Sequence, residues 1–190
     1  MRSIVLIATF SAILMSSASA QSSWKEYVYS DKGFAVSFPA EPAISTMPYK
    51  AADGTRVTET LYSVRQDSSL YQMAVVDFSQ AGIDQTTAVG QAVSALREKG
   101  NVTFDIPARQ NGTCGRYLTI KGNDGSTSVV SVFFRDKRLY EIQGTELASS
   151  ADSGSGYMIL FTQSFGFTVT LGYRGPCFEE GPEFFQNRRE

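Results

Sequence analysis

Histidine is absent from this sequence of 190 residues, and its absence excludes several classes of functional site. A Ser-His-Asp or Cys-His nucleophilic relay requires histidine, and so does a zinc or non-haem iron site with imidazole ligands. Two cysteines are too few for a structural zinc site or an iron–sulfur cluster. We therefore expect no metal and no cofactor, and an enzyme built on this sequence would have to use carboxylates or a Ser-Lys pair.

Blocks of charge of one sign are also missing. The 17 Lys and Arg residues are interspersed with 19 Asp and Glu residues, for a net charge of −2. Nucleic acids and anionic membranes recruit proteins through basic patches and tails, so neither is expected as a partner.

The one long apolar run lies at the N-terminus. Arg2 supplies a positive start, residues 4–15 are apolar, and the small residues Ala18, Ser19 and Ala20 follow. This pattern is typical of a secretory signal peptide, and the run is shorter than the roughly 20 residues that a membrane span needs. We expect residues 1–20 to be a signal peptide and the mature protein to be periplasmic or secreted, without stable membrane insertion.

The two cysteines, Cys114 and Cys177, have two interpretations. An oxidising compartment favours a disulfide between them. However, Cys114 alternates with Leu118 and Ile120 on a side of a predicted strand that faces the core, where a free cysteine behaves as a small hydrophobic residue. The sequence alone does not decide between a disulfide and two unpaired thiols.

The body of the chain is rich in predicted strands. A hairpin is expected at residues 24–29 and 34–38, with Gly33 in the turn, and a β-type pair follows at residues 56–65 and 69–78. An extended segment at residues 102–106 precedes an antiparallel meander at residues 113–121, 126–135 and 138–144.

Two segments have helical spacing instead. The first spans about residues 86–99, with Asp84 as N-cap and Gly100 as the residue after the C-cap, and the second begins near Tyr157, capped by Ser150 or Asp152. Because the 69–78 strand is apolar on both faces, helices should cover both faces of the sheet. We predict one α+β domain over residues 21–171, an antiparallel sheet flanked by helices, and an irregular tail over residues 172–190.

Several short segments resemble a group of exported bacterial proteins and, more distantly, the PsbP-like superfamily. The segments are Gly33-Phe34-Ala35-Val36-Ser37-Phe38-Pro39-Ala40-Glu41-Pro42, Asp53-Gly54, the strand with Tyr62, the central helix and Gln163-Ser164-Phe165. The resemblance implies an α/β/α sandwich and a binding or assembly role without catalysis. The aromatic residues that follow the proline in photosynthetic members are not evident here, which argues against a photosystem role.

Three groups of residues are candidates for a site. Asp77 and Glu141 are acids inside β-type runs, and they suit a hydrolase that uses carboxylates. Basic residues gather around the meander and would suit an anion-binding patch: Arg109, Arg116, Lys121, Arg135, Lys137 and Arg138. The tail carries aromatic residues that would suit a docking segment: Phe178, Phe184 and Phe185.

The first functional hypothesis is an exported binding or accessory protein without catalysis, acting on an envelope or secreted protein partner. The second is the carboxylate hydrolase, and the third is a structural component of the cell envelope.

Overall fold

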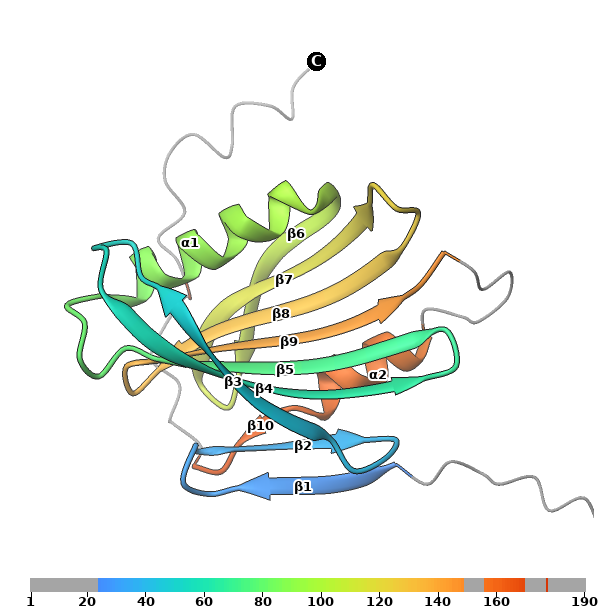
Figure 1. Cartoon of the computed structure of the whole chain (residues 1–190), viewed down its shortest axis with the longest axis horizontal. Coiled ribbons are helices and arrows are strands. Elements are labelled where there is room, and N and C mark those ends of the chain that lie inside the picture. Colours follow the sequence, from blue (N-terminus) through green and yellow to red (C-terminus); the bar gives the residue numbers. More distant parts are fainter. Residues whose placement is uncertain (1–23, 149–155, 170–176, 178–190) are drawn as a thin grey trace, which may run out of the picture.

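The computed structural model describes residues 24–148, residues 156–169 and Cys177 (Figure 1). The predicted signal peptide, the caps expected at Ser150 and Asp152, and the aromatic tail residues Phe178, Phe184 and Phe185 lie outside the described residues.

A large antiparallel sheet and a small one make up the β-structure of the described residues. The large sheet has seven strands in the order β3-β4-β5-β9-β8-β7-β6. Its strands are β3 (Ala43–Lys50), β4 (Arg56–Gln66), β5 (Ser69–Asp77), β6 (Gly100–Gln110), β7 (Thr113–Gly122), β8 (Thr127–Arg135) and β9 (Arg138–Glu146). The small sheet joins β1 (Lys25–Tyr29), β2 (Phe34–Phe38) and β10 (Gly166–Phe167) in the order β1-β2-β10.

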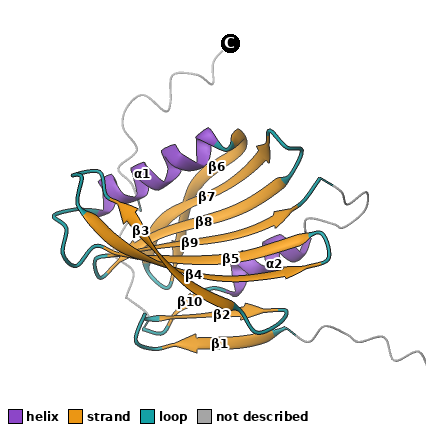
Figure 2. Ribbon diagram, viewed as in Figure 1, coloured by secondary structure: helices purple, strands orange, loops and turns teal. Residues whose placement is uncertain are grey.

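The two helices lie on opposite faces of the large sheet (Figure 2). Helix α1 (Gln85–Glu98) packs against β6, β7 and β8. Helix α2 (Gly156–Ser164) packs on the other face against β8 and β9, and it also contacts β2 of the small sheet. The predicted α+β class, with helices flanking an antiparallel sheet, is therefore confirmed.

Two hydrophobic cores result, one on each face of the sheet. Strand β5 contributes to both: Met73 packs with Phe34 and Phe161 on the α2 side, and Val76 packs with Leu96 on the α1 side. The alternation of side chains along a strand produces this division, as the two apolar faces of the 69–78 segment predicted.

The predicted hairpin, meander and central helix are all present. Asp84 caps α1 by accepting a hydrogen bond from the backbone N–H of Thr87 at 2.8 Å. In contrast, Gly100 does not end the helix with a positive φ angle but begins β6. A Cβ atom at Gly100 would overlap the backbone of Lys121, so close strand pairing explains this glycine.

Two strands differ from the sequence prediction because proline lies inside them. Strand β3 was not predicted; it has Pro48 in its interior and exposes nearly every residue. Strand β6 continues through Pro107 to Gln110 instead of ending near Ile106. Both strands are edges of the large sheet, where proline removes no ladder hydrogen bond that the sheet needs.

Candidate functional site

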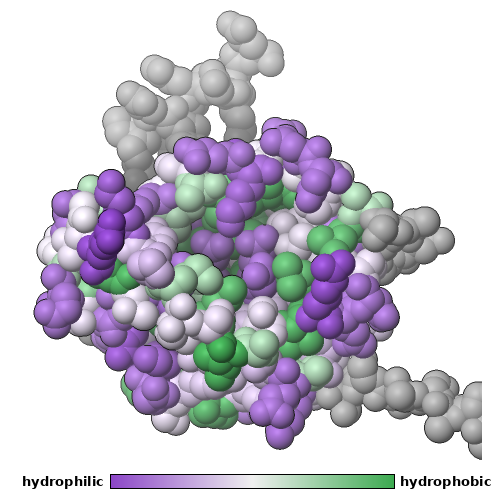
Figure 3. Space-filling view, in the orientation of Figure 1, coloured by the Kyte–Doolittle hydropathy of each residue, from purple (hydrophilic) through white to green (hydrophobic). Residues whose placement is uncertain are grey.

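Helix α1 packs over β6, β7 and β8 on one face of the large sheet. Beyond its C-terminal end the same face of β5, β8 and β9 forms a hollow of about 380 Å³, which we call the polar trough. Figure 3 shows this face of the molecule, with hydrophilic side chains inside a central depression. The trough is lined, among others, by Leu70, Gln72, Lys99, Ser128, Gln143 and Thr145.

Strand register brings these side chains together. Gln72 of β5 lies opposite Gln143 of β9, and Ser128 of β8 lies opposite Thr145 of β9. They share the α1 side of the sheet with Val130, which pairs with Gln143 and belongs to the core under α1. The α1 side of the sheet is thus apolar under the helix and polar beyond it.

A closed network of hydrogen bonds forms the floor of the trough. The Nε2 atom of Gln143 donates to the Ser128 hydroxyl at 3.1 Å and to the Thr145 hydroxyl at 2.9 Å. The two hydroxyl oxygens are themselves 2.9 Å apart and share a further hydrogen bond. Ser128 and Thr145 are only 7% and 6% exposed, so the network holds the Gln143 amide in place.

Charged residues lie along the same face, toward β4. The ammonium of Lys99 lies 3.9 Å from a carboxylate oxygen of Glu141, whose side chain is 22% exposed. Burial raises the pKa of Glu141, Lys99 opposes this shift, and Glu59 adds to it. Burial also raises the pKa of Glu59, and the positive charge of Lys99 opposes this shift as well. Glu59, Glu141 and Lys99 therefore act as one electrostatic group, and of the three Lys99 lines the trough.

The predicted pair of acids, Asp77 and Glu141, does not come together. Asp77 pairs with Arg138 in the strand register, and Glu141 pairs with Ala74, so alternation points the two carboxylates to opposite faces of the sheet. This placement removes the geometric basis of the hydrolase hypothesis as formulated with these two residues.

The acid that shares the surroundings of Glu141 is Glu59, which sequence analysis did not single out. Its position between Val57 and Leu61 was the available signal, because an acid that alternates with apolar residues faces the same side of the strand as they do.

Asp77 has structural partners of its own. Its carboxylate accepts a 2.9 Å hydrogen bond from the backbone N–H of Ser79 and lies 3.6 Å from the guanidinium of Arg138. Burial would raise the pKa of Asp77, but the Ser79 hydrogen bonds and Arg138 hold it below its ordinary value.

The six basic residues predicted as an anion-binding patch are divided among several places. Lys121 donates to the Thr127 hydroxyl at 2.7 Å, at the opposite end of the meander from Arg135 and Arg138. Arg116 bonds to Asp105 through Nε at 2.9 Å. Arg109 donates to the carbonyl of Gly112 at 3.3 Å, and Lys137 lies in the β8–β9 turn with φ of 59°.

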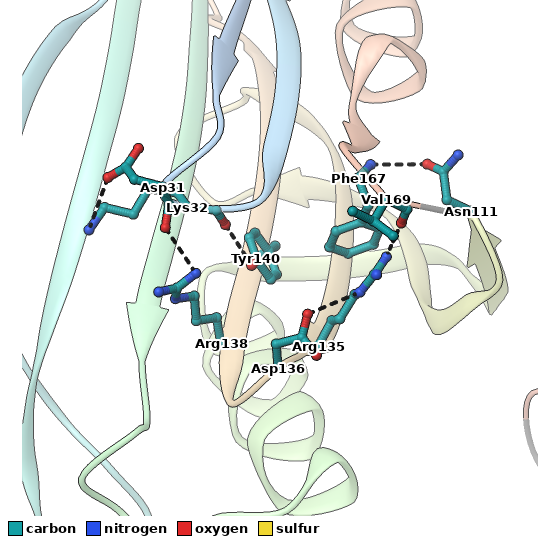
Figure 4. A network of polar contacts seen from close by, with 9 residues as sticks. All are labelled: Asp31, Lys32, Asn111, Arg135, Asp136, Arg138, Tyr140, Phe167 and Val169. Atoms are coloured by element: carbon teal, nitrogen blue, oxygen red, sulfur yellow. Dashed lines mark hydrogen bonds and ion pairs between the residues drawn. The ribbon is translucent and has the colours of Figure 1, made fainter. Parts of the chain in front are cut away.

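Arg135 and Arg138 hold the small sheet against the β8–β9 hairpin (Figure 4). Arg135 donates to the carbonyl of Val169, and its guanidinium lies 4.9 Å from the ring centroid of Phe167. Arg138 donates to the carbonyl of Asp31 at 3.2 Å. These contacts give both arginines a structural role.

Cys114 and Cys177 form a disulfide, with Cα atoms 5.0 Å apart across a sequence separation of 63. The sequence left open a disulfide or two unpaired thiols, and the structure contains the disulfide.

No group of three or more acids or cysteines in the described part of the chain could hold a metal ion. Neither helix of the described residues has the length and hydrophobicity that crossing a membrane requires.

Comparison with solved structures finds a similarity of fold. No protein-family model matches the chain, and no curated protein matches it. The fold is similar to the solution structure of cyanobacterial PsbP (CyanoP) from Synechocystis sp. PCC 6803, with a TM-score of 0.49 and 12% sequence identity, over 79% of this chain and 95% of that chain. The similarity agrees with the resemblance predicted from sequence, and at this level it carries no argument about function.

Proposed function

We propose that this protein is an extracytoplasmic binding protein without catalytic activity, and that the polar trough is its ligand site. The observation that carries this proposal is the Ser128–Thr145–Gln143 network, buried on a sheet face whose neighbouring residues pack under α1. Ligand sites commonly combine a concave shape with a few placed polar groups that fix the orientation of the ligand.

The chemistry of the trough favours a polar ligand that is neutral or cationic. Its floor offers amide and hydroxyl groups from Gln72, Gln143 and their neighbours, which recognise hydroxyl or amide groups on a ligand. Its lining carries one cation, Lys99, and one acid, Asp124, and the carboxylates of Glu59 and Glu141 interact electrostatically with Lys99. Together these four residues carry a formal net charge of −2 (three acids against one cation), which disfavours an anionic ligand.

The extracytoplasmic location rests on two features. The Cys114–Cys177 disulfide is typical of proteins that mature outside the reducing cytosol. The pattern of residues 1–20, which lies outside the described residues, is typical of an exported precursor.

Native mass spectrometry of the exported, non-reduced protein tests this function. We expect a bound small molecule to be recovered with the wild-type protein and lost from Gln72→Lys, which places a long charged side chain in the trough. The control is Ser94→Lys, which adds the same charge at an exposed position of α1 and should retain the molecule.

Two results would contradict the proposal: retention of the molecule by Gln72→Lys, or its equal loss from both variants. Recovery of an intact protein, lost only from Gln72→Lys, would instead favour an envelope or secreted protein partner at the trough.

A further inference from the structure

A second hollow, of about 280 Å³, lies where the β1–β2 turn meets the ends of β4, β5 and β9. We infer that this basic hollow binds a dianionic phosphate group. Three cationic side chains line it from three separate parts of the chain: Lys32 from the β1–β2 turn, Arg56 from the start of β4 and Arg138 from the start of β9.

The charge of the hollow matches a dianion. Its lining includes one acid, Asp77, besides the three cations, so its formal charge is +2 (three positive, one negative). The whole chain has a net charge of −2, so the positive charge is local to this place. A phosphate monoester near neutral pH carries a charge of about −1.5 to −2, which would neutralise it.

Arg138 is held in position before a ligand arrives. Its Nε atom lies 3.6 Å from the Asp77 carboxylate, and its Nη1 atom donates to the Asp31 carbonyl at 3.2 Å. Figure 4 shows Arg138 reaching from β9 toward the turn that holds Asp31 and Lys32. A guanidinium has five N–H donors in a rigid plane, which suits it to a phosphate group once its orientation is fixed.

Lys32 and Arg56 complete the cationic wall. The Lys32 ammonium lies 3.9 Å from the carboxylate of Asp31, which is 76% exposed, and an exposed pair of this kind is weak. Arg56 is exposed at the start of β4. Hydroxyl groups of Thr58, Thr60 and Ser79 also line the hollow and can donate to phosphate oxygens.

The basic hollow is distinct from the polar trough. Thr58 and Thr60 alternate with Val57 and Glu59 along β4, so they lie on the α2 side of the sheet, whereas the trough lies on the α1 side. A substitution in one site should therefore leave the other site intact.

Isothermal titration calorimetry with inorganic phosphate on the exported, disulfide-bonded protein tests the inference. We expect binding that Arg56→Gln weakens about tenfold or more, because a charge-assisted hydrogen bond is lost. The matched control is Lys121→Gln, which removes the same charge at the other end of the meander and should leave the affinity unchanged. Phosphate should also raise the unfolding temperature of the wild type and of Lys121→Gln more than that of Arg56→Gln.

Further ligands identify the source of the phosphate group. Tighter binding of glucose 6-phosphate than of inorganic phosphate, with no binding of glucose, would assign the hollow to a phosphate monoester, and the reverse order would assign it to the free ion. The inference is overturned if phosphate does not bind, if acetate binds as tightly as phosphate, or if both variants weaken binding equally.

Discussion

The hydroxyl of Tyr140 donates a 2.8 Å hydrogen bond to the backbone carbonyl of Lys32, 108 positions earlier in the chain. Tyr140 lies on β9 of the large sheet and is 1% exposed, and Lys32 lies in the turn of the small sheet. Gly33 follows with φ of +81°, a conformation that glycine adopts without strain. One side chain of the large sheet thus positions the turn of the small sheet.

Replacing Tyr140 by Phe should therefore lower the free energy of unfolding by about 1 kcal/mol, since it removes the hydrogen bond and leaves the ring packing intact. Urea unfolding monitored by fluorescence measures this change. Tyr157→Phe is the control, because Tyr157 is 56% exposed and should have no effect. Equal midpoints for the wild type and Tyr140→Phe would show that the bond adds nothing to stability.

Two glycine-to-alanine changes should have opposite effects on the stability of the protein. A Cβ atom at Gly144 of β9 would lie 2.9 Å from Cα of Met158, so Gly144→Ala should push α2 off the sheet and cost about 1–3 kcal/mol. A Cβ atom at Gly90, in the middle of α1, would meet nothing within 4 Å. Gly90→Ala should therefore stabilise the protein by about 0.5–1 kcal/mol. Thermal unfolding compares the two, and stabilisation by both would contradict the close packing of α2.

The stability of the protein should depend on pH through Glu141. Because burial raises its pKa above 4.5 in the folded protein, with Lys99 opposing and Glu59 adding to the shift, the folded state binds more protons there than the unfolded state. Its contribution to stability is present below pH 4.5 and is lost as pH rises through the folded pKa. Glu141→Gln should remove this loss, and Glu59→Gln should lower the pKa of Glu141.

Urea unfolding across pH 3 to 8 and NMR titration of the Glu141 carboxyl measure these effects. Asp124 provides a contrast of opposite sign, because hydrogen bonds from Ser126 hold its pKa below 3.8. Its contribution is present above pH 3.8 and is lost on acidification, so Asp124→Asn should lower stability above pH 3.8 and should have no effect once the wild-type carboxyl is protonated. If the stability of Glu141→Gln depended on pH in the same way as that of the wild type, the raised pKa of Glu141 would be contradicted.

Removal of the disulfide should be costly. The bridge closes a sequence separation of 63 residues, and chain-entropy reasoning gives a stabilisation of about 4 kcal/mol for a loop of this length. Cys177→Ser should lower the free energy of unfolding by an amount of that order, and so should the double change with Cys114→Ser. Peptide mapping without reduction should recover the Cys114–Cys177 peptide from the wild type, and free, alkylatable thiols there would contradict the bridge.

Local chemistry made most of the elements predictable. The β8–β9 turn at Asp136 and Lys137 has positive φ angles at both residues, a geometry that joins adjacent antiparallel strands through two residues. The spacing of Val89, Val93 and Leu96 likewise defined α1. Asn111-Gly112 is an equally local hairpin signal that sequence analysis did not use, and it forms the turn between β6 and β7 with φ of 46° and 81°.

Residues near one another in sequence thus determined the hairpins, the meander and the helices of this protein. Only the tertiary structure decided the pairing of β5 with β9 and the location of β3 at an edge. The β5–β9 register places Glu141 beside Ala74 and turns Asp77 to the other face, which created the polar trough and separated the two predicted acids. Such long-range pairing is selected by burial on both faces of the sheet against the entropy of closing a long loop, and no local pattern encodes that balance.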